Sequence, residues 1–130
     1  MKFKLALWIL GFMLERASKN NPQVRQKLQG QDMILEVGCE EGHARHFIIR
    51  DQQVLSYPGK ASAPVYLGPS LEPTFAITFD SARTGYETLT AKDKQLAMIG
   101  GIQDGRIHLL GNPLYLGWFQ SVLKLTQAGH

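Results

Sequence analysis

Alternating apolar and polar positions predict a pair of strands joined by a tight turn near the middle of the chain. One face of the first strand is apolar throughout, and it carries Met33, Leu35, Val37 and Cys39. Glu36 lies on the opposite face, as expected for a strand with one buried side. Residues 40–43 form the turn, because Gly42 supplies the backbone freedom that a short hairpin needs. We expect the apolar face to lie under helices.

Three further segments read as strands. Residues 52–59 continue the sheet and end at Pro58-Gly59, and residues 74–79 place Phe75, Ile77 and Phe79 on one side. Residues 102–110 form a last strand region with a turn at Asp104-Gly105. Between the third and fourth strands, residues 60–73 contain three prolines, which predicts a surface loop.

Helical signals occupy most of the remaining chain. Residues 3–17 are apolar on nearly all sides, which indicates burial against more than one surface, and Gly11 within them indicates close packing. A short helix follows the Asn21 cap and stops at Gly30. Two more helices are expected, one from Asp80 or Ser81 through Leu89, and one from a capping box at Thr90 and Asp93 to Gly100-Gly101.

A final helix, capped by Asn112, has an unusually wide apolar face. Two adjoining stripes make up this face, and they contain Leu114, Trp118, Val122 and Leu125, then Tyr115, Phe119 and Leu123, with Leu116 beside them. Such a helix either closes a core or forms the wall of a pocket, and the residues alone leave both interpretations open.

The order of elements gives an α+β fold, in which an antiparallel-rich sheet of about five strands is covered by helices on one face. Residues 73–125 then resemble the sterol carrier protein type 2 domain family, in a stand-alone bacterial form. The matching residues are Gly105, Ile107, Gly111 and Asn112, the last replacing the aspartate more usual in the family. The resemblance covers roughly residues 32–125 and implies an apolar cavity between sheet and helices. The apolar N-terminal helix is an addition to the family pattern.

The resemblance also implies that the chain has two segments with different roles. Residues 1–30 would be an N-terminal helical segment and residues 31–130 a lipid-binding domain, together one globular unit. The expected ligand is an apolar lipid, with a fatty acyl, isoprenoid or quinone-precursor, or phospholipid chain. Its cavity would be lined by Phe75, Ile77, Met98, Leu116, Trp118, Phe119 and Leu123. The N-terminal helix is the alternative occupant of that cavity.

The net charge of +3 makes an anionic membrane surface a possible partner. Lys2 and Lys4 begin the N-terminal helix, so Leu5, Trp8 and Phe12 are candidates for docking into an anionic bilayer. Docking predicts that removing residues 1–17 leaves the domain folded, whereas burial in the core predicts that it unfolds. Aromatic residues do not alternate with basic ones along a strand, so we expect no nucleic-acid partner.

Catalytic motifs are not recognisable in this sequence. It contains no nucleophile elbow, phosphate loop, dinucleotide fingerprint or zinc-protease motif, and Cys39 reads as a small apolar filler. His43 and His46, with Glu40 and Glu41, are interpreted as solvated polar residues around a turn rather than a metal site. We therefore expect a non-enzymatic protein with no cofactor and no metal, in the cytoplasm or peripherally attached to a membrane. The alternative is a structural or interaction module whose apolar helices form a homodimer or partner interface.

Overall fold

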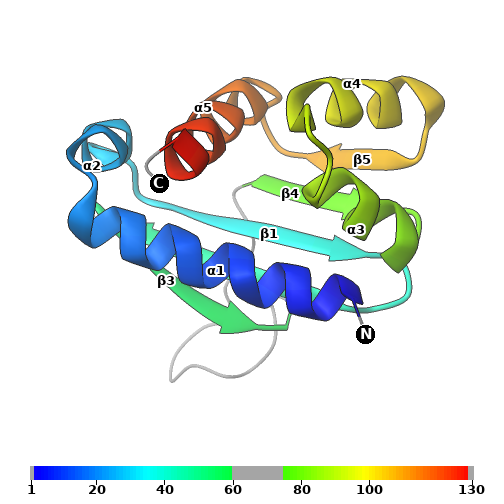
Figure 1. Ribbon diagram of the computed structural model, residues 1–130, viewed down its shortest axis with the longest axis horizontal. Coiled ribbons are helices and arrows are strands. Elements are labelled where there is room, and N and C mark those ends of the chain that lie inside the picture. The colour runs from blue at the N-terminus through cyan, green and yellow to red at the C-terminus, as the bar shows by residue number, and fades with distance from the viewer. Residues whose placement is uncertain (1, 60–74, 129–130) are drawn as a thin grey trace.

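The computed structural model describes residues 2–59 and 75–128, so the predicted loop at 60–73 lies outside the described residues. Five helices and five strands make up this part of the chain (Figure 1). They follow in the order α1 (Lys2–Asn20), α2 (Pro22–Leu28), β1 (Met33–Cys39), β2 (Ala44–Arg50), β3 (Gln53–Pro58), β4 (Phe75–Phe79), α3 (Ala82–Leu89), α4 (Lys94–Asp104), β5 (Ile107–Leu110) and α5 (Leu114–Ala128).

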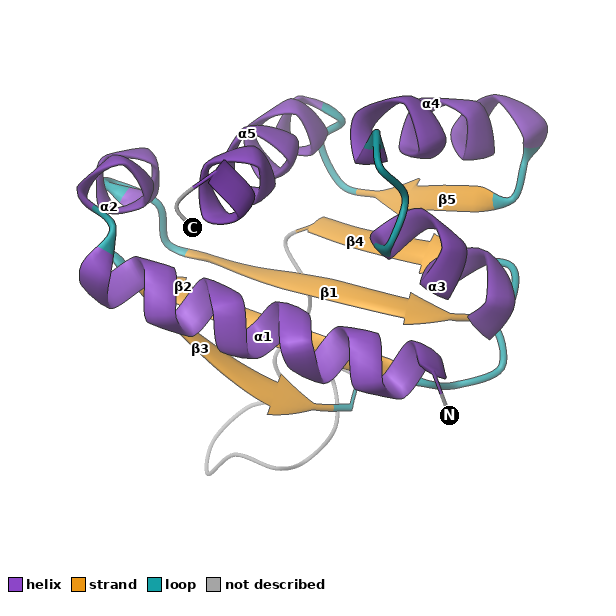
Figure 2. Cartoon of the chain, in the orientation of Figure 1, coloured by secondary structure: helices purple, strands orange, loops and turns teal. Residues whose placement is uncertain are grey.

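The strands form one sheet in the order β3-β2-β1-β4-β5. Neighbouring strands are antiparallel except β1 and β4, which are parallel and pair Val37 with Ile77. All five helices lie on the same side of this sheet (Figure 2). The expected α+β architecture with its N-terminal helix is therefore confirmed, and the sheet is mixed rather than purely antiparallel.

The β1–β2 hairpin forms where the alternation predicts it. Leu35 and Val37 are fully buried beneath the helices, and Glu36 is half-buried on the other face. Cys39 N donates to His43 O at 2.9 Å across the turn, and Gly42 has a φ of 100°. That φ is readily adopted by glycine and rarely by other residues, which fixes the turn at this position.

Helix α1 packs one of its two apolar sides into the core. Its buried apolar side chains recur every three or four residues, at Phe3, Leu7, Leu10 and Leu14. Gly11 lies on the same side, against β2 and β3, where a Cβ would stand only 2.9 Å from Arg45 Nε and would overlap Ser56. The absence of a side chain at Gly11 thus lets the helix approach the sheet closely, as the sequence indicates.

Polar caps set the start of the shorter helices. Asn21 Oδ1 accepts from Gln23 N at 2.9 Å at the start of α2. Ser81, rather than Asp80, caps α3. The predicted capping box is wrong, because Thr90 is the C-cap of α3 and Asp93 itself caps α4, where it accepts from Leu96 N at 3.0 Å. Each cap satisfies an amide that has no partner within its own helix.

The predicted end of α4 at Gly100-Gly101 is wrong. The helix continues to Asp104 and ends at Gly105, whose φ of 79° is the left-handed conformation common after a helix. Gly101 remains within the helix because it faces Ile107 of β5, where a Cβ would overlap the isoleucine side chain. The last strand accordingly begins at Ile107 instead of residue 102.

One core unites the N-terminal segment with the rest of the chain. Phe3 and Leu7 belong to the same buried cluster as Leu35, Phe75 and Phe119. A hydrogen bond of 2.9 Å from Trp118 Nε1 to Lys27 O also ties α5 to α2. The described residues before and after residue 30 therefore share one buried interior.

Candidate functional site

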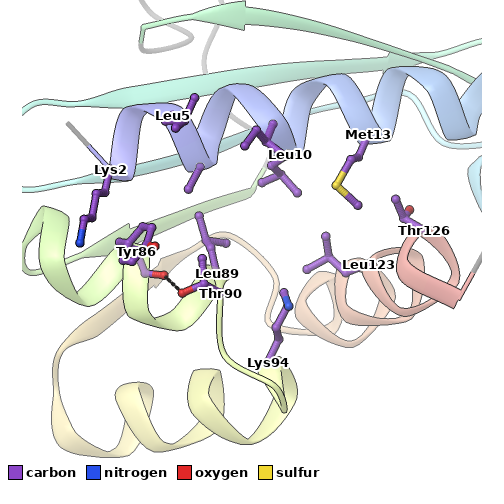
Figure 3. Close-up of a pocket in the computed structure, with 12 residues that line it drawn as sticks. Lys2, Leu5, Leu10, Met13, Tyr86, Leu89, Thr90, Lys94, Leu123 and Thr126 are labelled. Carbon is purple, nitrogen blue, oxygen red and sulfur yellow. Dashed lines mark hydrogen bonds between the residues drawn. The ribbon is translucent and has the colours of Figure 1, made fainter. Parts of the chain in front are cut away.

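An open apolar groove runs between α1 on one side and α3 and α5 on the other (Figure 3). Its volume is about 360 Å³, within the range of about 300–1,000 Å³ typical of small-molecule sites. The start of α4 contributes one residue to its wall. The lining residues are Lys2, Leu5, Ala6, Ile9, Leu10, Met13, Tyr86, Leu89, Thr90, Lys94, Leu123 and Thr126.

Helical spacing explains how each wall forms. Leu5, Ile9 and Met13 are four residues apart along α1, so they make a second apolar stripe beside the buried one. Tyr86 and Leu89 are three apart on α3 and line the groove on the side opposite α1. Leu5 remains 57% exposed and Ile9 42% exposed, which leaves apolar surface for a ligand to cover.

The two threonine hydroxyl groups in the wall already donate to backbone carbonyls one turn earlier in the chain. Thr90 Oγ1 donates to Tyr86 O at 2.7 Å, and Thr126 Oγ1 donates to Val122 O at 2.8 Å. These bonds use the hydroxyl protons locally, so the wall presents mainly carbon to the groove. Lys2 closes one end, with its Nζ 5.5 Å from the centroid of the Tyr86 ring.

The structure brings the predicted lipid-binding residues together in the core and places one of them in the groove wall. Leu123 lines the groove. Leu116 and Trp118 are half-buried against the core. The remaining members are almost completely buried, and these are Phe75, Ile77, Met98 and Phe119. Contact between a bound lipid and these core residues stays a prediction.

The predicted membrane-docking residues lie on the outer side of α1. Leu5 is 57% exposed, and Trp8 and Phe12 are each 54% exposed. The rings of Trp8 and Phe12 stack with centroids 6.0 Å apart. Together with Ile9 they form what we call the outward strip, which consists of Leu5, Trp8, Ile9 and Phe12. Because Leu5 and Ile9 also line the groove, the outward strip and the groove share an edge.

Sequence reasoning missed most of the groove wall. It assigned the apolar residues of α1 to the core, to a membrane, to the cavity as its occupant or to an interface, and never to the wall of a groove. The spacing of Leu5, Ile9 and Met13 was the available signal, because it is offset from the stripe that contains Leu7 and Leu14. No comparable signal pointed to Tyr86 and Leu89, since a groove depends on how separate helices pack.

The polar residues around the hairpin turn have structural roles. Glu41 accepts a 2.6 Å hydrogen bond from Ala82 N at the start of α3. His46 is completely buried, with its Nδ1 2.9 Å from Gly59 O and its ring stacked on Tyr57. The interpretation of His46 as a solvated residue is therefore wrong, because its side chain is completely buried.

Metal-binding clusters and membrane-spanning helices are both absent from the described residues. Residues 2–59 and 75–128 contain no group of three or more histidine, cysteine or acidic side chains placed to hold a metal ion. In the same part of the chain, no helix has both the length and the apolar character required to span a bilayer.

Comparison with known proteins identifies the fold. No family model and no curated protein sequence matches the chain. Among solved structures, the UbiJ-SCP2 ubiquinone synthesis protein is similar with a TM-score of 0.62 and 15% identity, over 94% of this chain and 96% of that one. Sterol carrier protein 2 from Yarrowia lipolytica, in its apo form, gives 0.61 and 12% over 92% and 90%.

A similar domain also occurs inside a larger enzyme. The sec-alkylsulfatase from Pseudomonas sp. matches 75% of this chain with 14% of its own length, at a TM-score of 0.51 and 16% identity. At these identities the likeness concerns the fold. The chain therefore has the sterol carrier protein 2 fold, and the resemblance found in its sequence is confirmed at that level.

Proposed function

We propose that this protein binds the apolar chain of a lipid in the groove between α1, α3 and α5 and carries it without chemical change. The observation that carries the proposal is the groove itself, with its carbon-rich walls and its exposed Leu5 and Ile9. The fold adds support, since two of its similar structures are named as a sterol carrier and a ubiquinone synthesis protein. A fatty acyl, isoprenoid or quinone-precursor, or phospholipid chain fits the chemistry of these walls.

Burial of the chain supplies the affinity. Each buried methylene contributes about 0.8 kcal/mol, so ten contribute about 8 kcal/mol before the cost of association. Micromolar binding requires about 8 kcal/mol net, which calls for more than ten buried carbons. We therefore expect affinity to rise steeply with chain length and then level off when the groove is full.

A matched pair of substitutions tests the groove. Ala6→Trp places an indole among the lining residues, whereas Ala97→Trp adds the same bulk at another half-buried alanine, on α4 outside the groove wall. Calorimetric titration with myristate should show binding to the parent protein and to Ala97→Trp, and a loss of at least tenfold in Ala6→Trp. Thermal melts check that both variants fold. A parent protein that binds no chain of any length would contradict the proposal.

The outward strip supports a second role, which is docking on an anionic membrane. Besides exposed Trp8 and Phe12, helix α1 carries Lys2, Lys4, Arg16 and Lys19, with Glu15 as its one acidic residue. Aromatic residues inserted at the headgroup level, together with about 1 kcal/mol per nearby basic residue, favour an anionic bilayer as the occupant. Docking there would bring the shared edge of the groove to the lipid surface and make the protein peripheral to a membrane.

Liposome sedimentation tests this docking. We expect binding to vesicles with anionic lipid, weaker binding to neutral vesicles, and loss of binding in the Trp8→Ser, Phe12→Ser double variant. Leu96→Ser is the matched control, because Leu96 is 66% exposed on α4, away from the outward strip. Native mass spectrometry tests the alternative, in which the outward strip forms a homodimer interface. A homodimer that the double variant abolishes, with no vesicle binding by the parent, would assign the strip to an interaction module instead.

A further inference from the structure

A second hollow continues the groove towards α4 and α5. It has a volume of about 590 Å³ and shares Lys94 and Leu123 with the apolar groove, so the two form adjoining parts of one surface depression. Its character is different, because polar and charged side chains line it. We call it the basic hollow, and the residues that matter here are Lys92, Lys94, Lys124, Gln120 and Ser121.

The charges lining the basic hollow are mostly positive. Lys92, Lys94 and Lys124 face a single acidic lining residue, Asp93. The carboxylate of Asp93 is engaged as the cap of α4, where it accepts from Leu96 N at 3.0 Å. The hollow therefore favours an anion, and the favourable charge lies at one side of a carbon-lined groove.

Lys94 stands where the two compartments meet. Its ammonium donates to Ala91 O at 3.0 Å, which holds the side chain at the start of α4. An ammonium has three N–H donors, so two remain for another acceptor. Figure 3 shows Lys94 pointing into the groove between Leu89 and Leu123. A ligand chain lying between those leucines would bring its polar end within reach of this ammonium.

Gln120 offers a second donor in the same hollow. Its Nε2 is buried and has no hydrogen-bond partner among residues 2–59 and 75–128. A buried donor without a partner is unfavourable, and a ligand oxygen that accepts from it would remove that penalty. Gln120 lies on α5, one turn before Lys124, and both residues line the basic hollow. The positive charge of the lysines and the unpaired donor of Gln120 thus both favour an anionic group with oxygen acceptors.

We propose that the basic hollow binds the anionic head, a carboxylate or a phosphate, of a lipid whose chain lies in the apolar groove. This inference rests on the proposed lipid-binding function and narrows its ligand to an acidic amphiphile. Lys2, at the far end of the groove, is a weaker candidate. Its ammonium lies over the Tyr86 ring, and in the hollow beside it Glu87 offsets one of the two positive charges, those of Lys2 and Arg83.

Calorimetric titration with three ligands of equal chain length tests the proposal on the full-length protein. Myristate and tetradecyl phosphate carry an anionic head at pH 7.5, and tetradecanol carries a neutral one. We expect the two acids to bind about tenfold more tightly than the alcohol, with the difference shrinking at high salt. Acetate and inorganic phosphate, tested alone, should bind at least a hundredfold more weakly than the matching amphiphiles.

Substitutions then locate the head. Lys94→Gln combined with Lys124→Gln should weaken both acids about threefold to tenfold and leave tetradecanol unchanged. Gln120→Leu should act in the same direction. The control is Lys27→Gln combined with Arg106→Gln, which removes the same charge from exposed positions outside both compartments. Lys2→Gln should have a smaller effect than Lys94→Gln.

The outcomes separate the two proposals. If none of the three amphiphiles binds, lipid binding itself fails. If all bind equally, or if Lys2→Gln rather than Lys94→Gln weakens the acids, the groove holds lipid but the head-group assignment is overturned. Tight binding of inorganic phosphate would also overturn it, because the hollow would then be a site for a free anion.

Discussion

The two apolar sides of α1 should contribute very differently to stability, and adjacent residues allow a direct comparison. Leu7 is 2% exposed in the core, whereas Trp8 is 54% exposed on the outward strip. Leu7→Ala removes buried carbon and leaves a cavity, which costs about 2–5 kcal/mol. Trp8→Ala removes a ring whose main partner is the stacked ring of Phe12, a contact worth about 0.5–1.5 kcal/mol.

These free energies convert into measurable shifts. For a chain of this size, 1 kcal/mol corresponds to about 3–5 °C in Tm. Leu7→Ala should therefore lower the Tm by about 6–25 °C, and Trp8→Ala by no more than about 8 °C. Far-UV circular dichroism gives the Tm, and urea titration gives the free energy of unfolding and its slope. The slope should not change, since both variants unfold from the same native structure.

A large loss of stability in Trp8→Ala would refute this reasoning. It would mean that the outward strip is covered in solution, either by a second copy of the chain or by another segment.

The same free-energy argument applies to the removal of residues 1–17. Four core side chains at about 2–5 kcal/mol each amount to about 8–20 kcal/mol, which is comparable to the total stability of about 5–15 kcal/mol usual for a domain, so burial favours unfolding on truncation.

The remaining predictions concern single side chains, and urea titration measures each of them. Gly85→Ala should cost about 1–3 kcal/mol, because the new Cβ would stand 2.7 Å from Cδ1 of the phenylalanine ring at the start of α1. Gly117→Ala should instead stabilise by up to about 1 kcal/mol, because nothing lies within 4 Å of the position that its new methyl group would take and alanine favours a helix. Equal effects at the two glycines would refute the packing argument. Ser18→Ala should cost about 1–3 kcal/mol, since its buried hydroxyl accepts from Val54 N at 3.2 Å and leaves that amide unpaired when removed. Asp93→Ala should cost about 0.5–2 kcal/mol through the lost cap of α4, and an unchanged stability would exclude that role.

Local chemistry made much of the fold predictable from sequence. Asn21 and Asn112 indicate helix starts because their short side chains accept from nearby amides, and Gly42 indicates a turn because of its φ. The role of Gly101 was predicted wrongly because it depends on a contact with another element rather than on local chemistry. It looks like a helix stop, but its role is to admit Ile107, a contact that no local pattern reveals.

The groove was less predictable because it is a property of packing between distant helices. Periodicity distinguishes a covered face from an exposed one, and it correctly marked Phe75 and Phe119 as covered. It does not distinguish a face that packs against other parts of the protein from a face that lines an open groove. Leu5 and Ile9 line the open groove, and their exposure depends on how α3 and α5 pack beside α1 rather than on their own sequence.

The crossing of α1 and α3 also bears on how the protein is made. Phe3 is synthesised about 80 residues before Gly85, the glycine that receives its ring. At roughly 5–20 residues per second, translation takes about 4–16 s to supply that partner. During this interval the nascent chain presents the core side of α1 and the outward strip at the same time. Aggregation then competes with folding, and a chaperone or membrane that shields α1 during translation should raise the yield of folded protein.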